Sequence, residues 1–324
     1  MTGIAGLADL YGAMARIVCF CTVVMSFGAI SLLPLRADEA NPLPVKEVAS
    51  GVFVYEAPIS LANESNLGAI ANLGFVIGRD GVAVIDTGGS LAAGKRLLAA
   101  IRLRTMQPIR YVVNTHMHPD HILGNAAFKA GGVTFVGHHN LPRALADREK
   151  AYLAANSALI GASFRGSEVM PPTLLVEEPV ELDLGDRRLR VEAWRTAHTN
   201  TDITVLDVAT GTWFLGDLLF IDHLPALDGS LIGWLRNVRT LRSRPAVRVV
   251  PGHGAPTAAW PEAVAPMERY LSRLMDDVRS LIRTGGTISE AAQQATQTEA
   301  GAWFLFDEFN SRNATAAFHE LEWE

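Results

Sequence analysis

A cluster of potential metal ligands stands at residues 114–121, which read Asn-Thr-His-Met-His-Pro-Asp-His. Three histidines, His116, His118 and His121, and one carboxylate, Asp120, fall within six positions. Imidazole and carboxylate suit zinc, and manganese and iron tolerate the same ligands. In a loop that leaves a strand, His116 and His118 can point one way while Asp120 and His121 turn to the other side. The spacing therefore predicts ligands for two adjacent metal ions.

Isolated histidine and aspartate residues further along the chain can complete such a site. His198, Asp217 and His253 each come shortly after an apolar run that predicts a strand. Those runs are Leu189–Trp194, Thr212–Leu215 and Arg248–Val250. One loop offers too few ligands for two ions, because zinc usually takes four. The three residues are therefore predicted to join the loop cluster in the folded chain.

The elements that must position these residues fall into two similar halves. In the first half, the predicted strands are Val52–Tyr55, Gly74–Ile77, Val82–Asp86, Ile109–Val113 and Val133–Val136, and the helices are Leu91–Arg102 and Arg143–Ser157. The second half adds strands at Leu182–Leu184, Thr204–Asp207 and the three runs above, with helices at Ile232–Leu241 and Glu262–Ile282. Each half is expected to be a sheet with helices on its outer face. Stacking the two sheets predicts an α/β (α+β) fold, a four-layer αββα sandwich.

Composition excludes several classes of protein. The chain has 324 residues, of which 49% are hydrophobic and 19% are charged, so it can bury a sizeable core. The formal net charge is -6 and no basic block occurs, so the charge does not favour a nucleic acid as partner, and a nuclease is disfavoured. Collagenous, coiled-coil and polytopic membrane classes do not fit this composition.

The first 37 residues have the order of a cleavable export signal. Arg16 precedes the apolar run Ile17–Leu35, and the small residue Ala37 follows it. Residues 1–37 are therefore predicted to be a signal peptide, and the remaining chain is expected to have no stable membrane insertion. A retained single anchor is the alternative. Both cysteines lie in the apolar run, so thiol chemistry is excluded from the rest of the chain.

Two further parts are predicted after the signal. Residues 38–284 are expected to form one catalytic domain, because the predicted sheets and the candidate ligands all fall within them. Residues 285–324 are expected to form a C-terminal helical appendix that covers the core.

The ordered ligand pattern resembles that of the metallo-β-lactamase superfamily, over about Gly51 to Leu281. The resemblance implies two Zn²⁺ ions, with iron or manganese as alternative metals. It assigns His116, His118 and His198 to the first metal, Asp120, His121 and His253 to the second, and Asp217 to both. The segment Val84–Gly88 matches an early motif of the family, in which Asp86 supports the metal loop through hydrogen bonds.

The resemblance also implies a mechanism. A water between two dications has its pKa lowered towards ~7, so a metal-bridging hydroxide is available to attack a carbonyl or thioester of a small substrate. Asp120 and Asp217 would hold the metals and orient the nucleophile, and Asp120 would take its proton. His223, six residues after Asp217, is expected on a loop above the metals, where it could contact substrate.

Within the superfamily, three segments look like the exported branch of quinoprotein relay system zinc metallohydrolases, which is related to SoxH-type proteins. These segments are Asn66–Phe75, Asp86–Ser90 and Asn114–His121. Membership of this branch implies a periplasmic protein associated with pyrroloquinoline-quinone (PQQ) dehydrogenases.

Three alternative functions remain open. One is a glyoxalase II-like thioesterase, although the basic C-terminal residues of that family are not evident here. Another is a mononuclear iron sulfur dioxygenase that uses part of the ligand set. The third is a non-catalytic, metal-dependent partner of a quinoprotein dehydrogenase. Activity on β-lactams is expected only as a weak side reaction.

Four other polar residues are candidates for substrate contacts. His138 and His139, after the strand Val133–Val136, are expected to border the cleft or to be solvated. Arg195 and Arg236 could bind a substrate carboxylate, but lone arginines are usually solvated.

Overall fold

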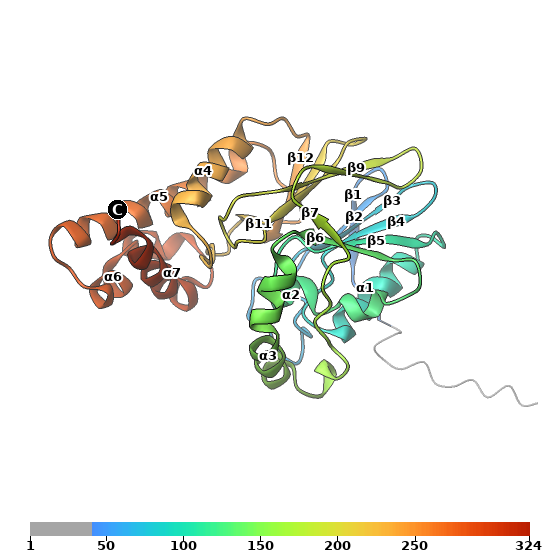
Figure 1. Ribbon diagram of the computed structural model, residues 1–324, viewed down its shortest axis with the longest axis horizontal. Coiled ribbons are helices and arrows are strands. Elements are labelled where there is room, and N and C mark those ends of the chain that lie inside the picture. The colour runs from blue at the N-terminus through green and yellow to red at the C-terminus, as the bar shows by residue number, and fades with distance from the viewer. Residues whose placement is uncertain (1–40) are drawn as a thin grey trace, which may run out of the picture. The chain divides into compact units, whose positions relative to one another are not determined.

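The computed structural model of the chain describes residues 41–324, and the predicted signal at residues 1–37 lies outside this range. Two sheets form the centre of the fold (Figure 1). The seven-stranded sheet has the order β1 (Val45–Ala49), β2 (Val52–Tyr55), β3 (Leu73–Ile77), β4 (Val82–Ile85), β5 (Ile109–Val113), β6 (Thr134–His138) and β7 (Leu174–Val176). The five-stranded sheet has the order β12 (Arg248–His253), β11 (Thr212–Phe220), β10 (Ile203–Asp207), β9 (Arg188–Ala193) and β8 (Val180–Asp183).

Alternation of side chains along the strands explains why the sheets stack. In β4, Ala83 and Ile85 face the second sheet, while Val82 and Val84 face the helices outside. In β11, Phe214 points into the space between the sheets and Trp213 points outward. The layer between the sheets is almost entirely aliphatic, so each sheet buries one face against the other.

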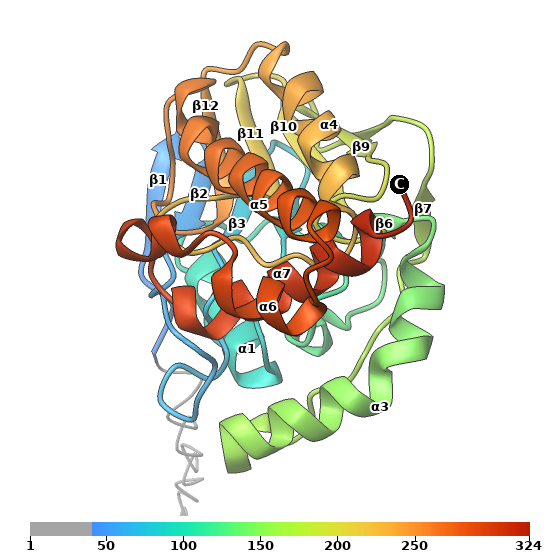
Figure 2. The same ribbon diagram turned by 90° about the vertical axis from the view of Figure 1, so that its left-hand side faces the viewer.

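Helices cover both outer faces. On the seven-stranded sheet, α1 (Leu91–Arg102) packs through Leu97 and Ile101, and Ser90 caps its N-terminus by accepting from the Ala93 N–H at 3.1 Å. On the five-stranded sheet lie α4 (Leu231–Arg242) and α5 (Ala265–Arg283) (Figure 2). The predicted four-layer αββα sandwich is therefore confirmed.

The remaining helices border the ligand loop or follow α5. The short α2 (Pro119–Ile122) starts within the ligand loop, and α3 (Leu141–Ile160) packs against it through Leu141 and Leu145. After α5 come α6 (Ile288–Gln294) and α7 (Phe306–Leu321), and both share the apolar core of α4 and α5. Short 3₁₀ helices complete the chain at Asn125–Phe128, Gly161–Phe164, Glu262–Val264 and Gln297–Ala302.

Some elements differ from the sequence predictions. β11 continues to Phe220 instead of ending at Leu215, because Gly216 adopts φ +52° and the pairing with β12 shifts register there without stopping. The predicted helix Glu262–Ile282 begins with a separate 3₁₀ turn, and α5 starts beside Pro266. β1 and β7, the two edge strands of the larger sheet, were not predicted.

The predicted boundary between residues 284 and 285 falls between α5 and α6. α6 and α7 follow this position, and both pack on the apolar core that α4 and α5 share. Within residues 41–324, no helix is both long and apolar enough to cross a bilayer.

Candidate metal centre

Buried polar side chains stabilise the loop that carries the His-x-His-x-Asp-His pattern. It begins where β5 ends, and Asn114 and Asn125 exchange two side-chain hydrogen bonds of 2.8 and 3.1 Å beneath it. His118 ends the extended part, and Pro119 starts α2, so the chain turns between His118 and Asp120. Because of this turn, the side chains of His116 and His118 lie at one position, and those of Asp120 and His121 lie at another.

Asp86 contacts the loop in the way that the family resemblance implies. It follows β4 with φ +57°, a conformation that Asp adopts more readily than most residues. Its carboxylate accepts from the Thr115 N–H at 2.8 Å, from the Thr115 hydroxyl at 2.7 Å and from His121 Nδ1 at 2.8 Å. All three groups are buried, so one carboxylate fixes both the loop backbone and the orientation of the His121 ring.

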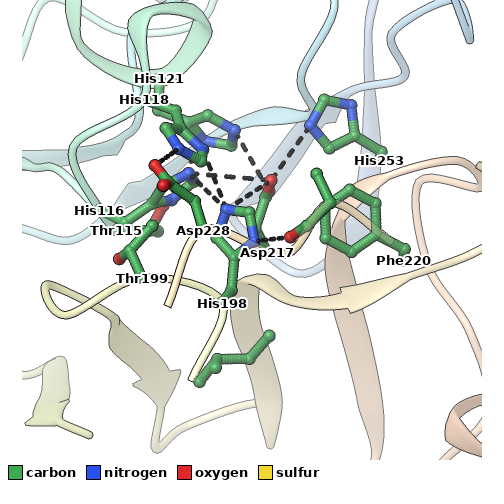
Figure 3. A network of polar contacts seen from close by, with 12 residues as sticks. Thr115, His116, His118, His121, His198, Thr199, Asp217, Phe220, Asp228 and His253 are labelled. Carbon is green, nitrogen blue, oxygen red and sulfur yellow. Dashed lines mark hydrogen bonds and ion pairs between the residues drawn. The ribbon is translucent and has the colours of Figure 1, made fainter. Parts of the chain in front are cut away.

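Four predicted ligands form a first cluster (Figure 3). His198 Nε2 lies 3.3 Å from His116 Nε2 and 3.0 Å from His118 Nδ1. Asp217 Oδ2 lies 3.4 Å from His198 Nε2 and 3.7 Å from His116 Nε2. Three imidazoles and a carboxylate that converge at these distances leave space for one ion between them.

The other three predicted ligands form a second cluster beside the first. Asp120 Oδ2 lies 3.6 Å from His121 Nε2 and 3.4 Å from His253 Nε2. Asp217 also reaches this cluster, with Oδ1 at 3.2 Å from His121 Nε2 and Oδ2 at 3.4 Å from His253 Nε2. The structure thus brings all seven predicted ligands together, with Asp217 between the two groups.

Each of the five histidines uses its second ring nitrogen to donate to an oxygen outside the clusters. His116 donates to Thr115 Oγ1, His118 to Asp228 Oδ2, His121 to Asp86 Oδ2, His198 to the Ala226 carbonyl and His253 to the Ile70 carbonyl, at 2.5 to 3.1 Å. These bonds place the proton of each neutral ring on its outer nitrogen, so the nitrogen that faces the cluster is the one that a metal ion can bind. His118 differs from the others, because its Nδ1 faces the cluster. A lone pair on every inward nitrogen is the arrangement that a metal ion requires.

Two orphaned atoms test whether this set fits a metal. His121 Nε2 and Asp217 Oδ1 are buried, have no hydrogen-bond partner within residues 41–324 and lie 3.2 Å apart. Two acceptors that face each other in a buried place repel unless a cation or proton lies between them. The residues present therefore fit a divalent cation.

The electrostatics of the clusters lead to the same conclusion. Burial would lower the pKa of His121, but Asp217, Asp86 and Asp120 outweigh burial and hold that pKa well above its usual value. Burial is the main cause that lowers the pKa of His198 to about 3, so its ring is neutral and available as a ligand. The carboxylates thus create a strong negative potential that favours bound positive charge.

Two glycines allow close packing around Asp217, one against its carboxylate and one against Thr115. A Cβ at Gly252 would lie 1.8 Å from Asp217 Oδ1, and a Cβ at Gly216 would lie 2.7 Å from Thr115 Cβ. Asp217 stands within β11 and not after a strand end, because the strand continues to Phe220, which corrects the sequence prediction. The register shift at Gly216 turns the carboxylate of Asp217 toward the ligand loop, which follows β5 of the other sheet.

A cleft of about 550 Å³ opens above the clusters. Most of its polar lining residues were not predicted from the sequence, because they lie on helices or loops with no local motif. Its missed polar residues include Arg148, Tyr152 and Asn156 of α3, Arg312 and Asn313 of α7, and Asp228. Asp228 is also the acceptor for His118, and no pattern in its loop singled it out.

The structure separates the other histidine candidates. His223 lines the cleft as expected, with its ring 4.8 Å from that of His253 and its Nδ1 donating to the Leu224 carbonyl at 2.6 Å. Burial, followed by the charge of His253, lowers the pKa of His223 to about 4. His138 and His139 line a different cavity of about 700 Å³, together with Arg195 and Arg236. Those four residues do not line the cleft above the metal ligands.

Comparison with known proteins agrees with this architecture. The family described as the metallo-beta-lactamase superfamily matches residues 68–253. A linear primary-alkylsulfatase of Pseudomonas sp. is 43% identical over 49 residues, which are 15% of this chain and 9% of that protein. The match thus covers less than a tenth of the curated relative.

Solved structures share the fold at low sequence identity. A metallo-beta-lactamase from Pontibacter korlensis has a TM-score of 0.57 and 22% identity, with 70% of this chain and 98% of that chain covered. The stereoselective inverting sec-alkylsulfatase Pisa1 from Pseudomonas sp. has a TM-score of 0.63 and 16% identity, with 86% of this chain and 50% of that chain covered. Because the family match includes the loop at 116–121 and extends to His253, the chain belongs to the metallo-β-lactamase superfamily.

Proposed function

We propose that the protein is a dinuclear zinc hydrolase that acts on a carbonyl or thioester bond of a small substrate. The observation that carries this proposal is the shared position of Asp217, whose carboxylate lies within 3.7 Å of ligand nitrogens in both clusters. A mononuclear iron dioxygenase would need only part of this set, so two complete groups favour a dinuclear centre.

The residues have distinct roles in this proposal. Bound at the two clusters, zinc ions would supply an activated water near neutral pH and polarise the substrate oxygen. Asp217 holds both groups of ligands at a fixed separation. Asp120 lines the cleft and is about one-fifth exposed, so its carboxylate can accept a proton from the nucleophile. His223 uses Nδ1 for the Leu224 carbonyl, which leaves Nε2 as an acceptor for a substrate group.

Export and a dehydrogenase partner are also part of the proposal. The order of residues in segment 1–37 supports cleavage after Ala37 and a periplasmic location. The resemblance to quinoprotein relay proteins supports association with a PQQ dehydrogenase. Cell fractionation with sequencing of the mature N-terminus tests the location, and co-purification from periplasm tests the association. An uncleaved protein in the cytosol would contradict both.

Sulfate-ester hydrolysis is a second candidate. The local 43% identity to a linear primary-alkylsulfatase favours it, and a sec-alkylsulfatase shares the fold. An alkyl sulfate therefore belongs in the substrate panel beside an ester, a thioester and a β-lactam.

The main test combines metal content with turnover. We expect two zinc ions per purified chain and hydrolysis of the ester or thioester, and we expect the His116→Ala variant to lose both its first metal and at least 100-fold in kcat/KM. One iron per chain with oxygen uptake would replace the proposal by a dioxygenase. Two zinc ions without turnover of any substrate in the panel would favour the non-catalytic partner.

A further inference from the structure

Two helices far apart in the sequence form walls of the cleft above the ligand clusters. On α3, Arg148, Tyr152 and Asn156 are spaced by four residues, so they share one face. On α7, Phe309 and Arg312 are three residues apart and also share a face. Each helix therefore presents to the same cavity a polar side chain that can donate hydrogen bonds and is not a predicted metal ligand.

One of the two arginines in this lining is not neutralised. Arg148 Nη2 lies 3.5 Å from Asp228 Oδ2, which also accepts from His118. Arg312 is exposed and, within residues 41–324, has neither an ion pair nor a hydrogen bond from its side chain. The other carboxylates of the lining, Asp120 and Asp217, are needed by the ligand clusters. Arg312 therefore presents an uncompensated positive charge to the contents of the cleft.

Tyr152 provides a second, independent sign of a ligand. Its hydroxyl is buried and has no hydrogen-bond partner among the described residues, although the residue lines the cleft. Buried hydroxyls in folded proteins nearly always have a partner, so an unpartnered one at a cavity wall favours a bound molecule there. A phenol hydroxyl can donate to an anionic oxygen, as a guanidinium can.

Apolar side chains make up a large part of the remaining lining. Leu61, Ile70, Phe220, Leu227 and Phe309 contribute carbon surface around the polar residues. A cavity of about 550 Å³ with such a lining suits a small molecule and excludes a folded partner. Its occupant should therefore combine an apolar body with a negative group.

We propose that the substrate is a small organic anion, and that Arg312 and Tyr152 hold its anionic group while the bond to be cleaved lies at the metal ligands. This inference rests on the proposed hydrolase function and gives it a substrate class. Neither side chain reacts; both determine specificity. Arg312 supplies charge and a planar pair of donors, and Tyr152 supplies one donor from the opposite helix.

Two esters with the same leaving group test the proposal. The full-length, zinc-loaded protein is assayed with 4-nitrophenyl butyrate, which is neutral, and with 4-nitrophenyl hemisuccinate, which carries a carboxylate. The measured quantity is the ratio of kcat/KM for the anionic ester to that for the neutral one. We expect the Arg312→Met variant to lower this ratio about tenfold, mainly through KM, and the Tyr152→Phe variant to lower it about threefold.

Control variants separate recognition from folding. Arg239→Met removes an exposed arginine of α4 that lies outside the cleft and has no partner among the described residues, so the ratio should stay at the wild-type value. Arg312→Lys keeps the charge but loses the planar fork, so its ratio should be intermediate. An equal loss of activity on both esters in Arg312→Met and Tyr152→Phe, or an unchanged ratio in both, would overturn the proposal.

A binding measurement keeps this inference distinct from the hydrolase function. Hexanoate is titrated calorimetrically into zinc-loaded wild-type protein and into Arg312→Met, and about tenfold weaker binding is expected for the variant. If neither ester is cleaved but this difference remains, the hydrolase function fails and the anion subsite stands. If hexanoate binds both proteins equally, the subsite is wrong whether or not the esters are cleaved.

Discussion

At the scale of single residues, the site depends on side chains that never reach the metal position. Each histidine ligand is oriented by an oxygen behind it, and two of these oxygens belong to carboxylates, Asp86 and Asp228. A carboxylate behind an imidazole fixes its tautomer and raises its basicity. The pKa of Asp228 shows the strength of this contact: burial would raise it, but the hydrogen bond and charge of His118, with Arg148, hold it below the usual value.

Replacement of Asp228 by Asn should weaken metal binding at the first cluster about tenfold, because a neutral amide is a poorer acceptor for His118 Nε2–H. Competition with a coloured chelator measures both zinc affinities. Asp222→Asn is the matched control: Asp222 is exposed on the same loop, has φ +62°, which Asn tolerates, and its side chain has no partner among the described residues. Equal zinc affinities for Asp228→Asn and wild-type protein would contradict this role.

Asp86→Asn should destabilise the metal-free fold by about 1–3 kcal/mol. Asn keeps the left-handed backbone and can still accept from the Thr115 N–H, but its NH₂ group then faces two donors, the Thr115 hydroxyl and His121 Nδ1–H. Urea unfolding of chelated protein measures the change in the free energy of unfolding. A variant as stable as the wild type under these conditions would show that the three hydrogen bonds make no net contribution to the free energy of unfolding.

At the scale of elements, α7 does more than cover the core. Asn313 Oδ1 accepts from the Leu227 N–H at 2.9 Å, and Asn313 Nδ2 donates to the Pro225 carbonyl at 2.6 Å. Glu320 accepts from the Leu231 N–H at 2.6 Å, where α4 begins. The segment held in this way includes Ala226 and Asp228, whose oxygens orient His198 and His118. The C-terminal helix is therefore connected to the first cluster by two hydrogen-bonded steps.

Truncation of Asn313 to Ala should lower the free energy of unfolding by about 1–3 kcal/mol, because it leaves two buried backbone groups without partners. It should also weaken zinc binding at the first cluster more than at the second. Thermal unfolding and a chelator competition test the two effects. Thr315→Ala, on the same helix, removes only a hydrogen bond to the Ser311 carbonyl and should change neither quantity appreciably. Unchanged zinc affinity in Asn313→Ala would show that the two-step connection does not reach the ligands.

At the scale of the whole molecule, the ligands come from both halves of the sandwich. His116, His118, Asp120 and His121 follow a strand of one sheet, and His198, Asp217 and His253 belong to the other. Bound metal would therefore link the sheets and stabilise the folded state over the unfolded chain, which cannot hold the same geometry.

Chelation should lower the midpoint of thermal unfolding by about 5–15 °C, since a ligand present at about 1,000 times its Kd adds roughly 4 kcal/mol to stability. Differential scanning fluorimetry with EDTA, followed by addition of zinc, measures the loss and the recovery. The midpoint of the His116→Gln variant should change less on addition of EDTA and of zinc. The midpoint of His319→Gln, at an exposed position, should change as the wild-type midpoint does. An unchanged midpoint in EDTA would contradict a structural contribution from metal.

Features of the fold and site could be predicted where residue type and strand pattern agreed. The seven ligands stand in or beside apolar runs, and the αββα layers follow from alternating strands such as Val82–Ile85, so both could be predicted. Asp228 could not, because a lone aspartate in a loop has no local signature until tertiary packing brings it to His118. Tyr152 and Arg312 were missed for the same reason, since only the packing of α3 and α7 places them at one cavity. Assignment to the quinoprotein relay branch of the superfamily has only the sequence resemblance to support it and stays a prediction.

The shared carboxylate of Asp217 has a consequence for how the centre fills. If two ions bind, as proposed, the first ion would partly neutralise the Asp217 carboxylate that attracts the second, and it would also order that side chain for the second ion. The two binding steps would then be thermodynamically linked and their free energies would not be additive. A titration followed to saturation should give a curve that a single class of identical, non-interacting sites fails to fit.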